Sequence, residues 1–357
     1  MPLGAETEAV LDTAARVFSD HAEAREPLWR ALEDTGLTLA ATPEAQGGVG
    51  LPPEAVFSLH RAAGAAAVPV PLAETLTARR LLAAAGMEAP EGPLTFACGG
   101  SVSGGRLTAE LYDVPFAGAA PHIVVLAEAA GAPTLALARV AQAESDAPSL
   151  GSLPPARPKE SQGGAEGGRI ALGLDPEADL SFDAAPILAS APIAWDADAA
   201  QAEAALMRAA QIAGAMDAAL SLTLAHTTAR EQFGRALSKF QAIQHMLSEM
   251  AGEIAAATAA VEAAAETAGP LTAPDRIAAG AAKLRASEAA GLVAAHAHQC
   301  HGAIGYTADY ALNRLTRRLW RWREQHGDET FWAVEIGRAA AAPNAPSLRR
   351  WIFGGPT

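Results

Sequence analysis

The stretch 230–244, which reads REQFGRALSKFQAIQ, holds the residues whose types and spacing best suit a charged ligand. A guanidinium group donates two parallel hydrogen bonds to phosphate, so Arg230 at the end of an expected helix suits a pyrophosphate. Gly234 allows a turn that a side chain would obstruct. The same letters also fit ordinary helix ends, because Ser238 and Gln241 have capping-box spacing and Gly234 can end a helix. The spacing alone leaves both interpretations open, and helix caps are the more common cause.

A second stretch, 299–310, reads QCHGAIGYTADY and follows an expected long helix. Gly302 would let backbone N–H groups approach a ligand closely, and Gly305 with Tyr306 would turn the chain into the next helix. An ordinary junction between two helices has the same features. Alone, this stretch is a weak indication of a binding site.

Several histidines lie beside this second stretch, but their spacing does not favour a metal site. Ligands on one face of a helix are three or four residues apart, and the candidates divide between two faces. No acidic group that would orient a ligating histidine is evident nearby, so we expect no metal. The arginines between residues 314 and 323 alternate with apolar residues, and we expect them to be solvated or salt-bridged. The metal candidates are His296, His298, Cys300 and His301.

Composition and charge limit the class of protein. The 357 residues are 50% hydrophobic and 18% charged, which argues against disorder over the whole chain. The net charge of −14 argues against a nucleic-acid partner and against an anionic membrane surface. Only two cysteines are present, and we find no signal-peptide or transmembrane pattern, so we expect a cytoplasmic protein. Nucleophile-elbow, Walker A and G-x-G-x-x-G patterns are absent, which leaves hydrolases and P-loop enzymes without support.

The elements that must position these stretches fall into three zones by composition. Residues 1–92 have helical patterns interrupted by a Gly- and Pro-rich loop, and 93–197 contain short apolar runs bounded by Gly, Pro and Ser. We expect a small antiparallel sheet in the middle zone and a polar loop over 141–168. Residues 198–357 show long apolar stripes at helical spacing, such as Ile212, Met216, Leu220 and Leu224, which predict a four-helix bundle. The expected fold class is α+β, with an N-terminal helical domain, a small β domain and a C-terminal bundle.

Taken together, three stretches resemble motifs of the acyl-CoA dehydrogenase family. The stretch 230–244 resembles its R-x-x-F-G…Q motif, and 299–306 resembles Q-x-x-G-G-x-G-Y. Near the N-terminus, 36–50 resembles a glycine followed by P-E-x-x-G-G-x-G. Their order and spacing match over most of the chain, and the family fold has the same three zones.

The resemblance implies FAD, an acyl-CoA thioester substrate, α,β-desaturation and an electron-transfer acceptor. It also implies a homo- or hetero-oligomer, because Arg230 would contact the FAD pyrophosphate of a neighbouring subunit and 299–303 would approach its adenosine. The carboxylate base would remove the α proton while the flavin accepts a hydride from the β carbon. The cofactor-binding residues implied in this way are Arg230, Gln232, Phe233, Gln241, Gln299, Gly302, Ala303 and Asp328.

The sequence departs from the family pattern at the base. The family's usual Glu falls at His326, and the position used by some relatives falls at Ala204, beside Glu203. His326 is therefore the first candidate base, since an imidazole suits proton transfer near neutrality, with Glu203 and Glu324 as reserves. The β domain also lacks the family's T-E-P-x-x-G-S-D motif, and 98–103 is only a distant candidate.

Two functions follow from this resemblance. In the first, the chain is an active FAD-dependent acyl-CoA dehydrogenase with its own base. In the second, it is a catalytically incomplete partner subunit of a heteromeric dehydrogenase and contributes to a neighbour's FAD site. The short chain and the altered β motif favour the second, whereas Arg230 and Gln299 fit both.

Overall fold

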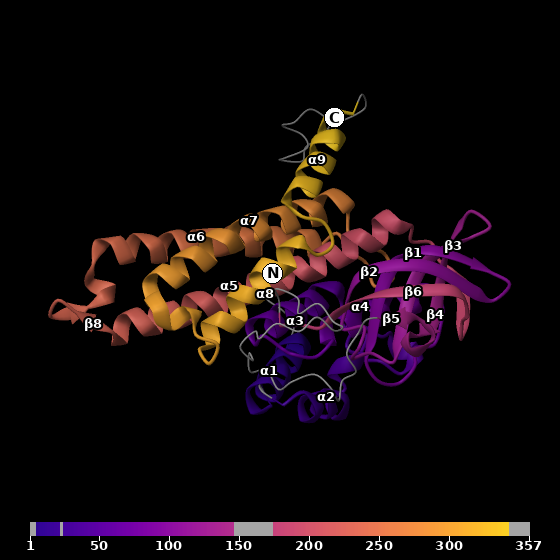
Figure 1. The fold of residues 1–357 in the computed structure, drawn as a ribbon, viewed down its shortest axis with the longest axis horizontal. Coiled ribbons are helices and arrows are strands. Elements are labelled where there is room, and N and C mark those ends of the chain that lie inside the picture. The colour runs from indigo at the N-terminus through magenta and orange to yellow at the C-terminus, as the bar shows by residue number, and fades with distance from the viewer. Residues whose placement is uncertain (1–4, 22–23, 146–173, 343–357) are drawn as a thin grey trace.

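The computed structural model describes residues 5–21, 24–145 and 174–342. Its N-terminal part is helical, and Figure 1 shows these helices below the long C-terminal helices and beside the sheet. The helices expected from apolar spacing are present, and Gly36 with φ 72° separates the second helix from a short 3-10 turn, as a left-handed glycine can. The bounds are α1 (Ala5–Asp20), α2 (Arg25–Asp34), η1 (Leu37–Leu39), η2 (Glu44–Gln46), α3 (Pro53–Ala65) and α4 (Leu72–Ala84).

The middle part is a seven-stranded sheet in the order β5-β6-β2-β1-β3-β4-β7. The sheet is mixed, so the expectation of an antiparallel sheet is wrong at one pair: β1 and β3 are parallel, with Leu94 opposite His122. The reason is the connection, because the hairpin from β1 to β2 returns the chain to the end where β1 began, and β3 starts there. The bounds are β1 (Leu94–Ser103), β2 (Arg106–Pro115), β3 (His122–Ala129), β4 (Ala132–Arg139), η3 (Val140–Gln142), β5 (Glu144–Ser145), β6 (Glu177–Pro186) and β7 (Ala189–Pro192).

The C-terminal part is built on four helices, with a fifth that the sequence patterns did not separate. Helices α5 and α7 run in the same direction, since an ion pair joins Asp198 to Arg276 near their starts and His226 stacks on His301 near their ends. The fifth helix, α9, projects from the body in Figure 1. The bounds are α5 (Ala197–Ala229), β8 (Glu231–Gln232), β9 (Arg235–Ala236), η5 (Leu237–Lys239), α6 (Gln241–Ala265), α7 (Arg276–His301), η6 (Gly302–Tyr306), α8 (Ala311–Glu324) and α9 (Glu329–Ala340).

One apolar cluster spans the three parts. It joins side chains of α4, β1, β3 and the bundle, from Leu81 and Phe96 to Val293, while two further clusters lie within the N-terminal part and within the sheet. Helices α3 and α5 cross at two glycines: a Cβ on Gly64 would lie 2.1 Å from the Gln211 carbonyl oxygen, and one on Gly214 would lie 1.9 Å from that of Arg61. The close crossing brings polar side chains of α3, α4 and α5 into one buried region.

The α+β class and its helix–sheet–helix order are confirmed. Helices α1–α4 lie within 1–92, the strands β1–β7 lie within 93–197, and α5 begins one residue before the expected boundary at 198. The domain limits themselves stay a prediction. The loop expected over 141–168 falls mostly on 146–173, which lie outside the described residues, while its first residues belong to η3 and β5.

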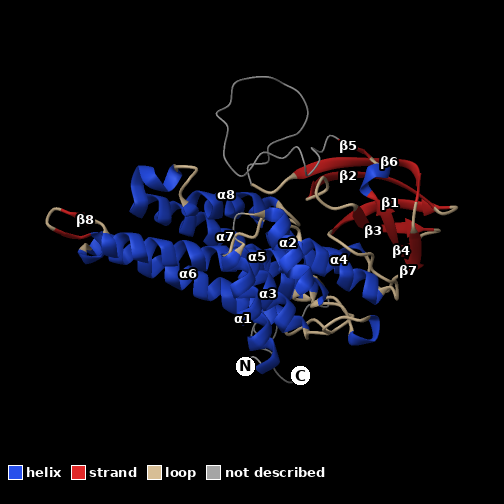
Figure 2. Cartoon of the chain, turned by 90° about the horizontal axis from the view of Figure 1, so that it is seen from below, coloured by secondary structure: helices blue, strands red, loops and turns tan. Residues whose placement is uncertain are grey.

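The sheet and the β8–β9 hairpin lie at opposite ends of the molecule. Both views show the hairpin at one extreme and the strands at the other (Figures 1 and 2). Helix α5 connects them with 33 residues, which corresponds to about 50 Å at the rise of an α-helix. The hairpin that follows Ala229 is therefore far from the β domain of its own chain.

Candidate functional site

The first candidate region is the free end of the bundle, formed by residues 226–241 and 298–310, which we call the bundle end. After α5, the chain makes a two-residue hairpin turn between β8 and β9, with Phe233 at φ 51° and Gly234 at φ 76°. Positive φ at both central residues is the signature of a type I′ turn, which suits tight hairpins. Phe233 is 92% exposed at the tip, so it is not a core residue.

The capping alternative for this stretch is wrong. Helix α5 ends at Arg230 as its C-cap, four residues before Gly234, and α6 begins after Phe240 with no side-chain cap. The backbone carbonyl of Ser238 instead accepts a hydrogen bond from the side-chain amide of Gln244 at 3.0 Å. Gly234 therefore belongs to an exposed hairpin, and Ser238 and Gln241 form no capping box.

The hairpin is held in place by aromatic and cationic contacts. The Arg235 guanidinium lies 4.1 Å from the centre of the Phe240 ring, a cation–π geometry, and Phe233 meets the same ring edge-on at 6.2 Å. Arg230, Arg235 and Lys239 are exposed there. In a chain of net charge −14, this concentration of cations favours an anionic ligand.

The second stretch singled out in the sequence lies at the same end. Gly302 ends α7 with φ 66°, and η6 follows it. Gln299, Gly302 and Ala303 are exposed, and the stacked rings of His226 and His301, with centres 4.4 Å apart, bring this turn beside the hairpin. The structure thus gathers most of the predicted cofactor-binding residues at the bundle end: Arg230, Gln232, Phe233, Gln241, Gln299, Gly302 and Ala303.

Exposed apolar side chains surround this group. Leu224, the last residue of the stripe predicted on α5, is 45% exposed, while Ile212 and Met216 are fully buried. Ile304 is 47% exposed and Tyr306 is 62% exposed. Apolar residues that gather on an exposed surface with cations are typical of an interface with another molecule.

Asp328 does not belong to this group. Its carboxylate caps α9 by accepting a hydrogen bond from the Phe331 N–H at 2.7 Å. The neighbouring Gly327 carbonyl accepts a hydrogen bond from Lys283, which is 18 residues before the end of α7. That separation is about 27 Å along the helix.

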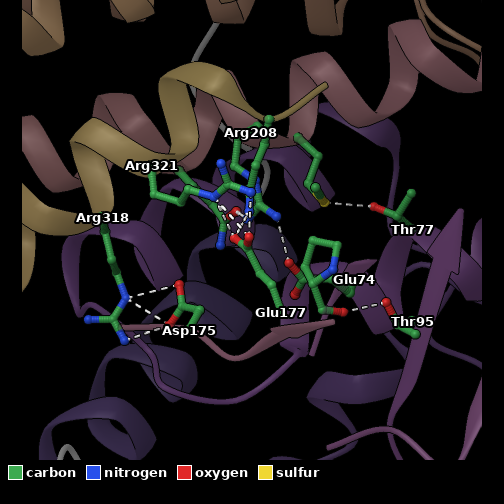
Figure 3. Close-up of polar contacts among 12 residues, drawn as sticks. Glu74, Thr77, Thr95, Asp175, Glu177, Arg208, Arg318 and Arg321 are labelled. Atoms are coloured by element: carbon green, nitrogen blue, oxygen red, sulfur yellow. Dashed lines mark hydrogen bonds and ion pairs between the residues drawn. The ribbon is translucent and has the colours of Figure 1, made fainter. Parts of the chain in front are cut away.

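The second candidate region is a set of buried polar residues where the three parts meet, which we call the buried centre. It consists of His60, Glu74, Arg208, Gln211, Lys283 and His326. Arg208 is 1% exposed and donates a hydrogen bond to Glu74 at 2.8 Å, which joins α5 to α4 (Figure 3). It also bonds to Gln211 and lies 5.6 Å from the Trp322 ring centre. Burial raises the pKa of Glu74, and the Arg208 charge opposes that shift.

His326, the first candidate base, lies in the buried centre. Its backbone has φ 57°, and its ring stacks on Phe96 of β1 at 5.6 Å. Burial and the nearby charges of Arg208 and Lys283 hold the pKa of His326 well below its usual value. Its Nε2 atom is buried without a hydrogen-bond partner, so the imidazole is neutral and weakly basic.

Lys283 fixes the loop that carries His326. Its Nζ is fully buried and donates to the carbonyls of Arg323 at 2.7 Å and Gly327 at 2.9 Å, and to the Ser287 hydroxyl at 3.0 Å. All three ammonium protons are used. Burial lowers the pKa of Lys283 to about 7, while Glu329 opposes the shift.

The reserve base candidates lie elsewhere. The Glu203 carboxylate is fully buried and forms an ion pair with the Nε of Arg80 at 2.9 Å. Burial raises the pKa of Glu203. The side chain of Glu324 is 61% exposed and pairs with Arg321 at 3.0 Å. The three candidates therefore have three different sets of partners.

Ion pairs also close the junction between α8 and the β domain. Arg318 binds Asp175 at 2.8 Å, and Arg321 binds Glu177 (Figure 3). The expectation that the arginine run is salt-bridged is confirmed for these two residues, although they face the β domain rather than solvent.

Sequence reasoning missed His60, Glu74, Arg208, Gln211 and Lys283. Burial, with the charges of Arg208 and Arg80, lowers the pKa of His60 to about 3. The available signal was a single arginine and a single lysine within alanine-rich helical runs. Among the described residues no cluster of three metal-ligating side chains occurs, and no helix there is long and apolar enough to cross a membrane.

Comparison with known proteins agrees with the motifs. A family profile described as "Acyl-CoA dehydrogenase, C-terminal domain" matches residues 198–328. The chain is 36% identical over 104 residues to 3-sulfinopropanoyl-CoA desulfinase of Paraburkholderia xenovorans, covering 29% of this chain and 26% of that protein. It is 28% identical over 144 residues to acyl-CoA dehydrogenase IpdE2 of Mycolicibacterium smegmatis, covering 40% and 44%. The matched segment thus spans less than half the length of these curated relatives.

Solved structures resemble nearly the whole chain. A variant of the Tcur3481-Tcur3483 steroid ACAD is 28% identical, with a TM-score of 0.76 over 93% of this chain and 96% of that chain. The ChsE4-ChsE5 complex from Mycobacterium tuberculosis is 20% identical, with a TM-score of 0.79 over 96% and 99%. The second likeness is one of fold alone.

Proposed function

Since this chain belongs to the acyl-CoA dehydrogenase family, we propose that it acts in acyl-CoA α,β-desaturation as the partner subunit of a heteromeric dehydrogenase. In this role, its bundle end completes the FAD site of a neighbouring chain. One observation carries the proposal: the bundle end is exposed and lies about 50 Å along α5 from the β domain of its own chain. A ligand held between a bundle end and a β domain therefore needs two chains.

The residues of the bundle end fit such a cofactor. Arg230 would hold the pyrophosphate by paired hydrogen bonds, with Arg235 and Lys239 adding to the positive potential. Gly302 would let the backbone of the turn approach the adenosine side, because nothing lies within 4 Å of the position a Cβ would take. The exposed Phe233 and Tyr306 would pack against the neighbouring chain. The bound FAD supplies the hydride acceptor of the reaction.

The buried centre supports a partner role rather than independent catalysis. A general base works best when its pKa lies near the operating pH, and Arg208 and Lys283 move the pKa of His326 away from that range. Arg208, whose charge helps to lower the pKa of His326, is paired with Glu74 and packed on Trp322. This pairing balances the charges of Arg208 and Glu74 within the chain and suits a structural centre.

The test is the visible spectrum of the chain expressed alone and with a second acyl-CoA dehydrogenase chain. We expect no flavin band from the chain alone and a band from the assembly. Arg230→Ala in this chain should remove flavin from the assembly, whereas Arg30→Ala, an exposed arginine on α2, should not. Undiminished flavin in the Arg230 variant would contradict the proposal.

The second candidate function, an active homo-oligomeric acyl-CoA dehydrogenase, has one observation in its favour. The unpartnered Nε2 of neutral His326 is free to accept a proton. If the chain alone binds flavin and an acyl-CoA bleaches it, His326→Ala should abolish the bleaching while flavin stays bound. Bleaching by the chain alone would favour this function over the partner role.

A further inference from the structure

We propose that the stacked pair His226–His301 is the positioning element of the bundle end, and that it joins the hairpin to the turn only while both rings are neutral. This inference rests on the proposed function and extends it, because it states how the two binding stretches are kept in one arrangement. The two rings belong to different helices and lie 4.4 Å apart at an angle of 24°.

Each ring is directly connected to one of the stretches. The His226 carbonyl accepts a hydrogen bond from the Arg230 N–H at 2.8 Å, so the last turn of α5 runs from this ring into the hairpin. His301 immediately precedes Gly302, where α7 ends. A change in the separation of the rings would therefore move Arg230 relative to Gly302.

One hydrogen bond shows which ring nitrogen of His301 carries a proton. Its Nδ1 lies 2.8 Å from the Ala297 carbonyl, and because a carbonyl only accepts, Nδ1 carries the proton. Its Nε2 is buried without a partner, and Tyr310 packs edge-on at 5.2 Å. A second proton on Nε2 would place an unsolvated charge against the His226 ring.

The charges around the pair oppose protonation. The Arg230 charge acts on His226 from the end of α5, and His226 itself acts on His301. Burial and the Arg230 charge lower the pKa of His226, and burial, opposed by the Ala297 hydrogen bond, lowers that of His301. Both rings stay neutral in the folded chain until the pH falls below their depressed pKa values. Once the stack opens, each ring regains its ordinary pKa of about 6.5 and binds a proton below that pH, so acidification favours the open arrangement.

Two substitutions distinguish the effect of ring stacking from the effect of ring protonation. His226→Phe keeps an aromatic ring that can stack but cannot be protonated, whereas His226→Ala removes the ring. Near pH 7.5, trypsin should cut after Arg230 or Arg235 about tenfold faster in the alanine variant, while the phenylalanine variant should stay within about twofold of the wild type. Equal cleavage of all three proteins would overturn the inference, and this measurement needs no flavin.

The second measurement uses FAD added to the purified assembly between about pH 5.5 and 7.5. The wild-type assembly should bind FAD about tenfold more weakly at the lower pH, and the His226→Phe assembly should change by less than about threefold. Parallel pH profiles for the two assemblies would overturn the inference while leaving the proposed function intact. If no assembly binds FAD at any pH, the proposed function fails, and the cleavage rates alone decide whether the pair joins the two stretches.

Discussion

The bundle end and the buried centre contain similar residue types in opposite environments. At the bundle end, Arg230 is exposed and Phe233 is 92% exposed, while in the buried centre Arg208 is 1% exposed and bonded to Glu74. One region offers cations and apolar surface to an external partner. The other satisfies its charges inside the chain. This difference is what the proposed partner role requires.

The comparison also concerns how each region is built. The bundle end uses two short stretches that follow two parallel helices. The buried centre uses side chains from α3, α4, α5, α7 and the loop after α8, which meet only in the folded chain. Changes in the first region should alter binding with little effect on stability, and changes in the second should do the reverse.

The largest effect is expected from Glu74→Gln, which removes the charge opposite Arg208. Arginine cannot lose its proton, so its charge would remain buried and unpaired, at a cost of about 3–5 kcal/mol in the free energy of unfolding. Arg208→Met should cost less, because burial already raises the pKa of Glu74 and the carboxyl can become neutral. Chemical unfolding measures both, and equal stability of Glu74→Gln and the wild type would remove the distinction between the two regions.

Arg230→Gln should weaken the retention of FAD by the assembly by about 1.5–3 kcal/mol, the value of hydrogen bonds to a charged group. Because the Arg230 side chain is exposed, the free energy of unfolding of the isolated chain should change by less than about 0.5 kcal/mol. FAD titration and urea unfolding provide the two readings. A large loss of stability without a loss of FAD would reverse the assignment of the bundle end.

Lys283→Met tests the buried centre through pH. A lysine whose folded pKa of about 7 lies below its unfolded value binds fewer protons in the folded state, so its burial costs stability at low pH and less as the pH rises toward 10. The stability of Lys283→Met relative to the wild type should therefore fall between about pH 7 and pH 10. A constant difference between the two proteins over this range would show that Lys283 does not titrate in the folded chain.

The smallest effect is expected from Glu324→Gln. Its side chain is 61% exposed and its partner Arg321 keeps Glu177, so the loss should be below about 1 kcal/mol. The melting temperature measures the loss. A shift as large as that of Glu74→Gln would mean that exposure does not govern the difference between these acidic residues.

Much of the fold was predictable because its signals are local. Apolar spacing predicted the long helices of the bundle, and Gly, Pro and Ser marked the ends of the first strands. The parallel pairing of β1 with β3 was not predictable, since it depends on which side of β1 the third strand occupies. Helix α9 was not separated, although Gly327 and the N-cap Asp328 stand before it.

The sequence by itself determined the helices, the order of the three parts, and the motif stretches 230–244 and 299–310, because each depends on residues near one another in the chain. Tertiary structure alone decided that these stretches share one exposed end, since that requires α5 and α7 to run parallel. It also decided that His326 lies beside Arg208 and Lys283, far apart in sequence. The physical reason is that burial and the charges of neighbours set the basicity of a side chain, and only packing supplies those neighbours.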